Sequence, residues 1–222
     1  MEPTCWTIVH AAAGGDAESR ALFWKSYAAP IRAYLLERWC RASLTNDVED
    51  AVQDVFVECF KQDGALRAAD AERGSFRAFL FGIVRNVARR HEERVARSGR
   101  LTASQTSILE ELPARDASLS RVFDRAWALG IMTEAVRRHA AIGADRDEEF
   151  RQRYRILRLR IEDGLPIRTI AERLALEATR VHNDYRRARR EFRETLRLVV
   201  VDHGSLDVDA ECARLIDLLA TD

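Results

Sequence analysis

Apolar side chains recur at helical spacing along almost the whole chain. Over residues 48–60 and 76–87 they return every three or four positions, which places them on one face of an amphipathic helix. No segment alternates apolar and polar residues as a half-buried strand would. Glycine and proline number only 10 and 4 among the 222 residues. The pattern predicts an all-α protein, with two small helical domains joined by a partly helical linker.

Capping residues indicate where the first helices begin. Asp16, which follows two glycines, is expected to be an N-cap. Pro30 predicts the end of that helix and the first turn of the next one. The sequence Asn46-Asp47-Val48-Glu49 has the form of a capping box at the start of the helix over 48–60. Three helices are therefore expected before residue 61.

The helix that Ser75 is expected to cap changes character along its length. Its apolar stripe ends at Val87, and arginines then take the same azimuth. The pattern predicts a helix that leaves the core and continues as a basic rod. Phe81 lies among arginines on the far side of this helix, where it either stacks on unpaired bases or packs under a neighbouring helix.

The second half of the chain begins with a polar stretch. Residues 98–116 end near Pro113 and are typical of a linker or a loosely packed loop. A helical segment at about 117–140 follows, and another helix begins at about Phe150. Residues 167–196 then have the pattern of two helices separated by a sharp turn.

This helix pair predicts a helix-turn-helix. One apolar stripe of the second helix runs from Val181 to Leu196, and arginines lie on the opposite face. A recognition helix needs this division, because one side anchors in a core while the other offers donors to base edges and phosphates. The alternative is an ordinary surface helix with a solvated basic face.

The formal net charge of zero hides separate charge blocks. Residues 151–198 hold 14 basic and 7 acidic side chains, and residues 85–100 hold 6 and 2. Residues 46–63 hold 1 and 6, as do residues 199–222. The basic blocks suit a polyanion and the acidic helix suits a basic protein partner. The acidic tail either folds back on the C-terminal domain and restrains DNA binding, or completes the core of that domain.

Several kinds of chemistry have no support in the sequence. The four cysteines and five histidines lack metal-ligand spacing, so neither a metal site nor a cofactor is expected. A phosphate-cradling glycine loop and a nucleophile motif are also absent, which argues against an enzyme. No apolar run is long enough to span a bilayer, and the N-terminus does not resemble a signal peptide. A cytoplasmic protein without membrane contact is expected.

Three motifs together identify a family resemblance. They are DVEDAVQDVFVECF at 47–60, GSFRAFLFGIVRNVARR at 74–90, and VHNDYRRARREF within residues 151–197. With them the chain resembles bacterial RNA polymerase sigma factors of the small extracytoplasmic-function (ECF) type, in a subgroup with a long linker and a C-terminal extension. The resemblance implies a non-catalytic factor that binds core RNA polymerase and directs promoter recognition and transcription initiation.

The resemblance also implies a division of the chain. Residues 1–97 correspond to sigma region 2, which binds core polymerase and the minus-ten element. A linker follows over 98–149, with its helix at about 117–140. Residues 150–198 correspond to the region 4 helix-turn-helix, and 199–222 form the acidic extension. The implied partners are core RNA polymerase, double-stranded promoter DNA and the opened non-template strand, and an anti-sigma factor or a kinase is a further candidate.

Site residues follow from the matching motifs. The residues implied to dock on the polymerase are Asp47, Asp50, Gln53, Asp54 and Phe56. Those implied to meet the minus-ten element are Arg85, Asn86, Arg89 and Arg90. Those implied to read the minus-thirty-five element are Arg180, His182, Asn183, Arg186, Arg187 and Arg190. Phe56 also lies in the apolar stripe of its helix, so a pure core role is the alternative for that residue.

Two points qualify the resemblance. Ala175 stands where the family usually has glycine at the turn, and an alanine in a left-handed conformation costs about 1–2 kcal/mol, so a different turn is expected. The alternative function is a helix-turn-helix transcriptional regulator that acts without docking on polymerase. That alternative leaves Asn86 and the basic extension of its helix unexplained.

Overall fold

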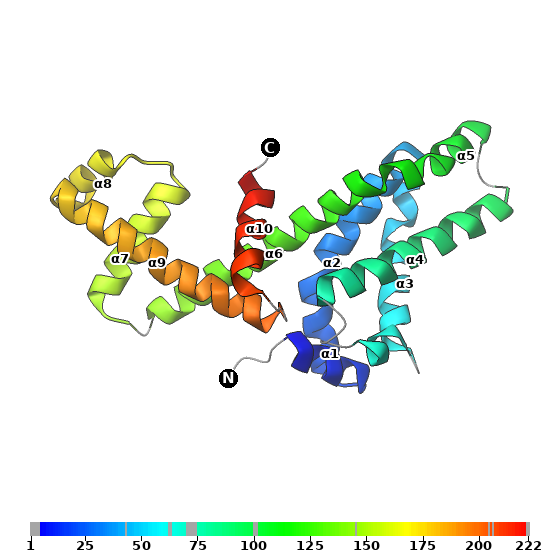
Figure 1. Cartoon of the computed structure of the whole chain (residues 1–222), viewed down its shortest axis with the longest axis horizontal. Coiled ribbons are helices and arrows are strands. Elements are labelled where there is room, and N and C mark those ends of the chain that lie inside the picture. The colour runs from blue at the N-terminus through cyan, green and yellow to red at the C-terminus, as the bar shows by residue number, and fades with distance from the viewer. Residues whose placement is uncertain are drawn as a thin grey trace. The chain divides into compact units, whose positions relative to one another are not determined.

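The computed structural model describes residues 5–42, 44–61, 64–69, 75–99, 102–144, 146–203, 205 and 207–220. All regular elements within these residues are helical, and Figure 1 shows the ten α-helices in chain order. The all-α prediction is confirmed. The chain divides into two compact units, one formed by residues 1–130 with 200–222 and the other by residues 131–199.

The N-terminal unit contains the first five helices, the first part of α6 and the last helix. The helices with their bounds are α1 (Cys5–Ala13), α2 (Ala17–Trp39), α3 (Val48–Phe60), α4 (Phe76–Arg97), α5 (Ala103–Glu110), α6 (Asp116–Ala144) and α10 (Val208–Ala220). Helix α1 was not expected from the sequence. It is short, and Trp6 anchors it, with its ring 5.7 Å from that of Phe76.

Helix α2 passes through Pro30 without a break, so the predicted break is wrong. The predicted cap at its start is confirmed, because the Asp16 carboxylate accepts a hydrogen bond from the Ser19 N–H at 2.7 Å. Interior proline removes one backbone hydrogen bond and costs about 3 kcal/mol. Large buried side chains on both sides of Pro30 hold the helix together: Phe23, Tyr27, Ile31, Tyr34, Leu35 and Trp39.

The capping box predicted for α3 does not form. Asp47 occupies the cap position, but its side chain makes no capping hydrogen bond there. Its Oδ2 atom lies 3.0 Å from the Nε2 atom of His91 on α4 instead. The apolar stripe of α3 is buried as predicted through Val48, Val52, Val55, Phe56 and Cys59. Glu49, the acidic member of the predicted box, accepts hydrogen bonds from Arg32 of α2. Tertiary contacts therefore hold both carboxylates at the start of α3.

Helix α4 begins as predicted, since the Ser75 hydroxyl accepts a hydrogen bond from the Ala78 N–H at 3.3 Å. The prediction that it leaves the core after Val87 is wrong. His91, Glu92 and Val95 are all buried, so one side of α4 stays in the core almost to its end. Polar side chains continue the core here because each finds a partner on α2 or at the start of α3.

The stretch expected to be a loose linker is largely helical. Thr102 and Gln105 form a capping box at the start of α5. A short 3-10 turn, Leu112–Arg115, then leads directly into α6, and the Leu112 side chain is almost fully buried. Helix α6 contributes Leu119, Phe123 and Trp127 to the core of the N-terminal unit. Buried apolar side chains such as Leu112 and Leu119 therefore pack this segment against the N-terminal unit.

The acidic tail packs within the N-terminal unit, which differs from both predicted contacts with the C-terminal domain. Arg214 of α10 lies 3.6 Å from Asp124 of α6. The His203 ring lies 5.9 Å from that of Trp127. Cys212 and Leu215 are buried. The tail therefore completes a core, but it is that of the other unit.

The C-terminal unit contains the end of α6 and three further helices. They are α7 (Glu148–Ile161), α8 (Ile167–Leu174) and most of α9 (Ala178–Asp202). Its core includes a cluster formed by Ile156, Leu159, Ile170, Ala171 and Val181. A second layer surrounds His139 of α6, which packs among the rings of Phe150, Tyr154 and Phe192.

None of the described helices combines the length and apolarity that crossing a membrane requires. Across the same residues, no group of three or more His, Cys, Asp or Glu side chains is arranged to hold a metal ion.

Candidate nucleic-acid interface

The turn between α8 and α9 places an alanine in the left-handed conformation. Ala175 has φ 54° and ψ 46°. The Leu176 N–H donates to the Ala171 carbonyl at 2.9 Å, and the Ala175 N–H donates to the Glu172 carbonyl at 3.2 Å. Both bonds satisfy carbonyls at the end of α8. The turn thus keeps the left-handed cap and does not change, contrary to the expectation based on Ala175.

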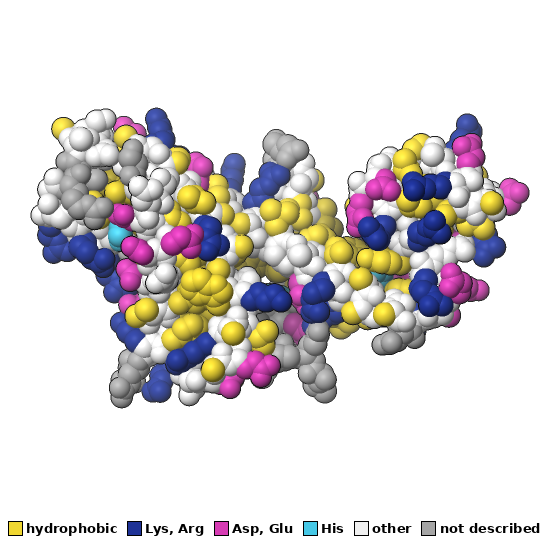
Figure 2. Space-filling model, turned by 180° about the vertical axis from the view of Figure 1, so that it is seen from behind, with side chains coloured by type: hydrophobic (Ala, Val, Ile, Leu, Met, Phe, Trp, Pro, Cys, Tyr) yellow, Lys and Arg dark blue, Asp and Glu magenta, His cyan; other side chains and the backbone are white. Residues whose placement is uncertain are grey.

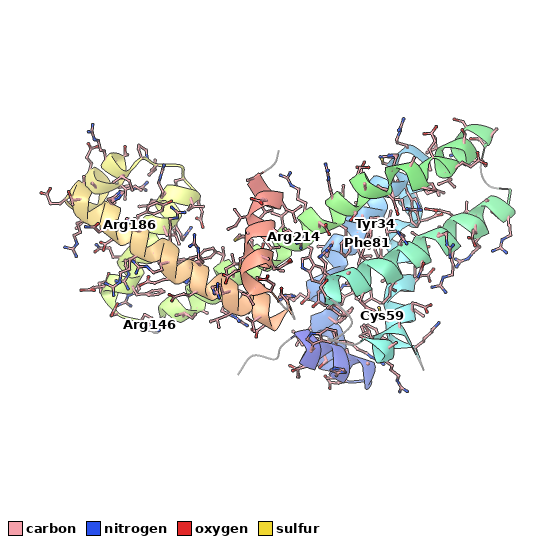
Figure 3. All side chains as sticks on the ribbon, in the orientation of Figure 1. Tyr34, Cys59, Phe81, Arg146, Arg186 and Arg214 are labelled. Carbon is pink, nitrogen blue, oxygen red and sulfur yellow. The ribbon has the colours of Figure 1, made fainter. Side chains whose placement is uncertain are left out.

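Helix α9 presents a polar face opposite the stripe that enters the core. The six residues assigned to the minus-thirty-five element are all exposed: Arg180, His182, Asn183, Arg186, Arg187 and Arg190. Val181 and Ala188 are buried on the other side. Figure 3 marks Arg186 on this helix, and Figure 2 shows, from behind, Lys and Arg side chains interspersed with acidic and hydrophobic ones on the C-terminal unit.

Carboxylates on the same helix lie near two of these arginines. The Arg180 guanidinium lies 3.8 Å from Asp184, and the Arg187 guanidinium lies 3.7 Å from Glu191. Both pairs have i,i+4 spacing along the helix, and both arginines are largely exposed. Such exposed pairs are worth only about 0.3–0.5 kcal/mol. A phosphate or a base edge can therefore replace the carboxylate at little cost.

Helix α4 carries the second basic surface. The residues assigned to the minus-ten element are all exposed: Arg85, Asn86, Arg89 and Arg90. Arg85 Nη1 donates to Asp116 Oδ2 of α6 at 2.9 Å. Arg90 Nη2 donates to Glu58 Oε2 of α3 at 3.0 Å. Two of the four are thus already held by carboxylates of neighbouring helices.

Phe81 of α4 packs under neighbouring helices, which confirms the packing alternative. Its ring centroid lies 5.3 Å from that of Tyr34 on α2 and 5.1 Å from that of Phe123 on α6. Figure 3 shows the labelled Tyr34 and Phe81 next to each other. Aromatic pairs at these separations are favourable. Phe81 therefore stabilises the N-terminal unit in this structure.

The residues assigned to polymerase docking occupy different environments on α3. Phe56 is only 4% exposed, and its ring centroid lies 4.2 Å from that of Trp24. Asp47 is bound to His91, as described above. Asp50 and Gln53 are exposed, and Asp54 is partly exposed at 3.8 Å from Arg94. Phe56 has the position expected of a core residue, and the exposed polar surface is formed by the other side chains.

An apolar groove beside this surface was not predicted. It has a volume of about 450 Å³ and is lined by Trp24, Gln53, Phe56, Val57, Phe60 and Lys61. Val57 is 62% exposed, although it lies in an otherwise amphipathic helix. An apolar residue on the polar face of the predicted helix was the available signal in the sequence.

A buried ion pair that the sequence analysis missed joins α2 to α4. Arg38 Nε donates to Glu92 Oε1 at 2.6 Å, and Trp39 Nε1 donates to the same oxygen at 2.7 Å. Burial by itself lowers the pKa of Arg38, but the hydrogen bond and charge of Glu92 outweigh it and raise that pKa. Glu92 follows Val84 and Ala88 at helical spacing, so a carboxylate in the core stripe was the signal.

Comparison with known proteins identifies part of the chain. Residues 23–98 match the family described as Sigma-70 region 2. The matched segment runs from α2 to the end of α4, so it contains both the α3 surface and the basic face of α4. This part of the chain is similar to sigma-70 region 2, and the match supports a factor of the sigma-70 family. No match is found among curated proteins.

Proposed function

We propose that this protein is a sigma factor of the ECF type, which binds core RNA polymerase and directs it to promoters. The match of residues 23–98 to sigma-70 region 2 carries the proposal, because that family acts in transcription initiation. A separate unit with a helix-turn-helix supports it by supplying a second DNA contact. The factor itself performs no catalysis.

In the proposed complex, the exposed surface of α3 docks on the polymerase. Asp50 and Gln53 are accessible there, and Asp54 forms a long ion pair with Arg94 at 3.8 Å. Acidic and amide side chains beside an apolar groove suit a basic partner that also buries apolar area. Phe56 supports this surface by packing in the core beneath it.

The two basic helices then take different parts of the promoter. The exposed face of α9 suits the major groove of duplex DNA, since arginine pairs with guanine and with phosphates. The exposed arginines and Asn86 of α4 suit the minus-ten element and the opened non-template strand. An anti-sigma factor or a kinase remains a candidate regulator of the protein.

The deciding experiment is run-off transcription with purified core polymerase, with and without the protein. Promoter-specific transcripts that need the protein are expected. A helix-turn-helix regulator without polymerase docking would bind DNA but yield no such transcripts from core enzyme alone. That result would overturn the proposal.

A charge reversal tests the docking surface. Asp54→Arg is expected to abolish binding to core polymerase, because it places a positive charge against a basic partner, while DNA binding by the C-terminal unit persists. Glu110→Arg is the matched control, since Glu110 is exposed on α5 and the charge change is the same. Normal assembly by the Asp54 variant, measured by native gel or light scattering, would refute the assigned surface.

A further inference from the structure

Three residues of α4 form a line along one side of the helix. Arg77, Phe81 and Arg85 are each four positions apart, so they lie one turn above another. Two cations with an aromatic ring between them match how proteins hold single-stranded nucleic acid, where arginines contact phosphates and rings stack on bases. These three residues are called the α4 stripe.

In the structure, helix α6 covers this stripe with matching groups. Arg77 is hydrogen-bonded to Asp124, and Arg85 to Asp116 at 2.9 Å. The Phe123 ring of α6 lies 5.1 Å from Phe81. The two helices run antiparallel at this contact. Arg77, near the start of α4, meets Asp124, whereas Arg85, two turns further along α4, meets Asp116 in the first turn of α6. Helix α6 therefore sets a carboxylate, a ring and a carboxylate against the three residues of the α4 stripe.

The two ends of this contact differ in accessibility. Asp116 is in the first turn of α6 with its side chain 37% exposed, and Arg85 is 53% exposed. Arg77 and Asp124 are only 24% and 16% exposed. Solvent weakens exposed ion pairs more than partly buried ones. An incoming phosphate can thus compete first at Arg85, next to the exposed Asn86.

We propose that α6 is an intramolecular competitor of single-stranded DNA at the α4 stripe, with Asp116 and Asp124 in the places of phosphates. The inference rests on the proposed function, since the competing ligand is the opened promoter strand. Arg77 thereby becomes a further DNA-binding residue, beside the four already assigned on α4. While α6 is in place, the affinity of the free protein for single strands stays low.

The test measures binding of the full-length protein to a fluorescent 12-nucleotide single strand rich in adenine and thymine. Asp116→Asn with Asp124→Asn keeps the side-chain shapes and removes both competing charges. We expect this variant to bind about three- to tenfold more tightly, because neither Arg77 nor Arg85 then has a competing carboxylate. Asp116 also lies 3.9 Å from Arg38 and Asp124 lies 3.6 Å from Arg214, so thermal unfolding of the double variant checks that losing these contacts does not unfold α6 or α10. Its affinity should also fall more steeply with salt, by a slope of up to about 0.7 for each arginine released.

Two controls separate competition from a general charge effect. Glu110→Gln with Glu111→Gln removes two exposed carboxylates outside the stripe, and we expect it to change the affinity less than twofold. The single Asp116→Asn variant retains the more buried Arg77–Asp124 pair, and its thermal unfolding checks that α6 stays folded. We expect the single variant to show part of the gain.

Hydrogen exchange gives a readout that does not depend on variants. Adding the oligonucleotide to the wild-type protein should speed exchange of the first-turn amides of α6, because Asp116 is released. Equal affinities of the wild-type protein and the Asp116/Asp124 variant, an equal gain in the Glu110/Glu111 control, or unchanged exchange on saturation would each overturn the inference. If run-off transcription still depends on the protein, only the inference has failed. If transcripts are absent, the proposed function has failed.

Discussion

The left-handed alanine between α8 and α9 is expected to lower the stability of the C-terminal unit. Ala175 has φ 54°, a conformation that costs a residue with a Cβ atom about 1–2 kcal/mol relative to glycine. Glycine also raises the entropy of the unfolded chain, which offsets about 0.4–1 kcal/mol of the gain. Ala175 is exposed, so its methyl group makes no contact in the core. Ala175→Gly is therefore expected to stabilise the C-terminal unit by about 0.5–1 kcal/mol.

Two further variants test whether the gain in stability comes from the positive φ of residue 175. Ala175→Val introduces a branched side chain at the same positive φ, and it is expected to destabilise the unit. Ala141→Gly is the matched control, because Ala141 is exposed in the right-handed helix α6 of the same unit. Glycine there should cost about 0.5 kcal/mol.

The assay must report on the C-terminal unit alone, since the two units need not unfold together. Urea dependence of hydrogen exchange at amides of α8 and α9 meets this need. A loss of stability in Ala175→Gly, or the same sign of change in Ala175→Gly and Ala141→Gly, would refute a left-handed residue at this turn.

Three other predictions concern stability and binding. Burial lowers the pKa of His139, and the charge of Glu191 opposes this effect more weakly. The unfolded chain therefore binds more protons than the folded chain near this pKa. The C-terminal unit should lose stability as the pH falls below about 6.5. His139→Phe should flatten that dependence in urea titrations, and a parallel pH profile would contradict it. Glu92→Gln leaves Arg38 buried without its counter-charge and should lower the free energy of unfolding of the N-terminal unit by about 3–5 kcal/mol in chemical denaturation. A decrease of less than about 1 kcal/mol, as for a surface ion pair, would count against a buried pair. Arg186→Ala should weaken promoter binding by about 1–3 kcal/mol if it contacts a base, and Lys25→Ala, a change on the N-terminal unit, serves as its control in the same titration; equal affinities would rule out Arg186.

The helical periods predicted most elements because each amphipathic stripe needs a core to face. The apolar stripes of α3, α4 and α9 predicted that Val52, Val84 and Val181 are buried, and the structure confirms all three. The turn before α9 could also be predicted, because the helical spacing of apolar residues is interrupted there in the local sequence. Charge blocks likewise separated the acidic α3 from the basic faces of α4 and α9, since charge is a property of the residues themselves.

Only tertiary structure decided what the ambiguous residues do. Pro30 stays inside a helix because the packing of α2 outweighs a lost backbone bond, and the Asp47 side chain contacts His91 on another helix while Asp47 keeps the cap position of α3. The partner of Arg85 lies 31 positions away in α6, and that of Arg38 lies 54 positions away in α4. Periodicity identifies which face of a helix is buried, but not which helix covers it. For this reason the sequence determined the two basic surfaces, and the fold determined that α6 covers part of one.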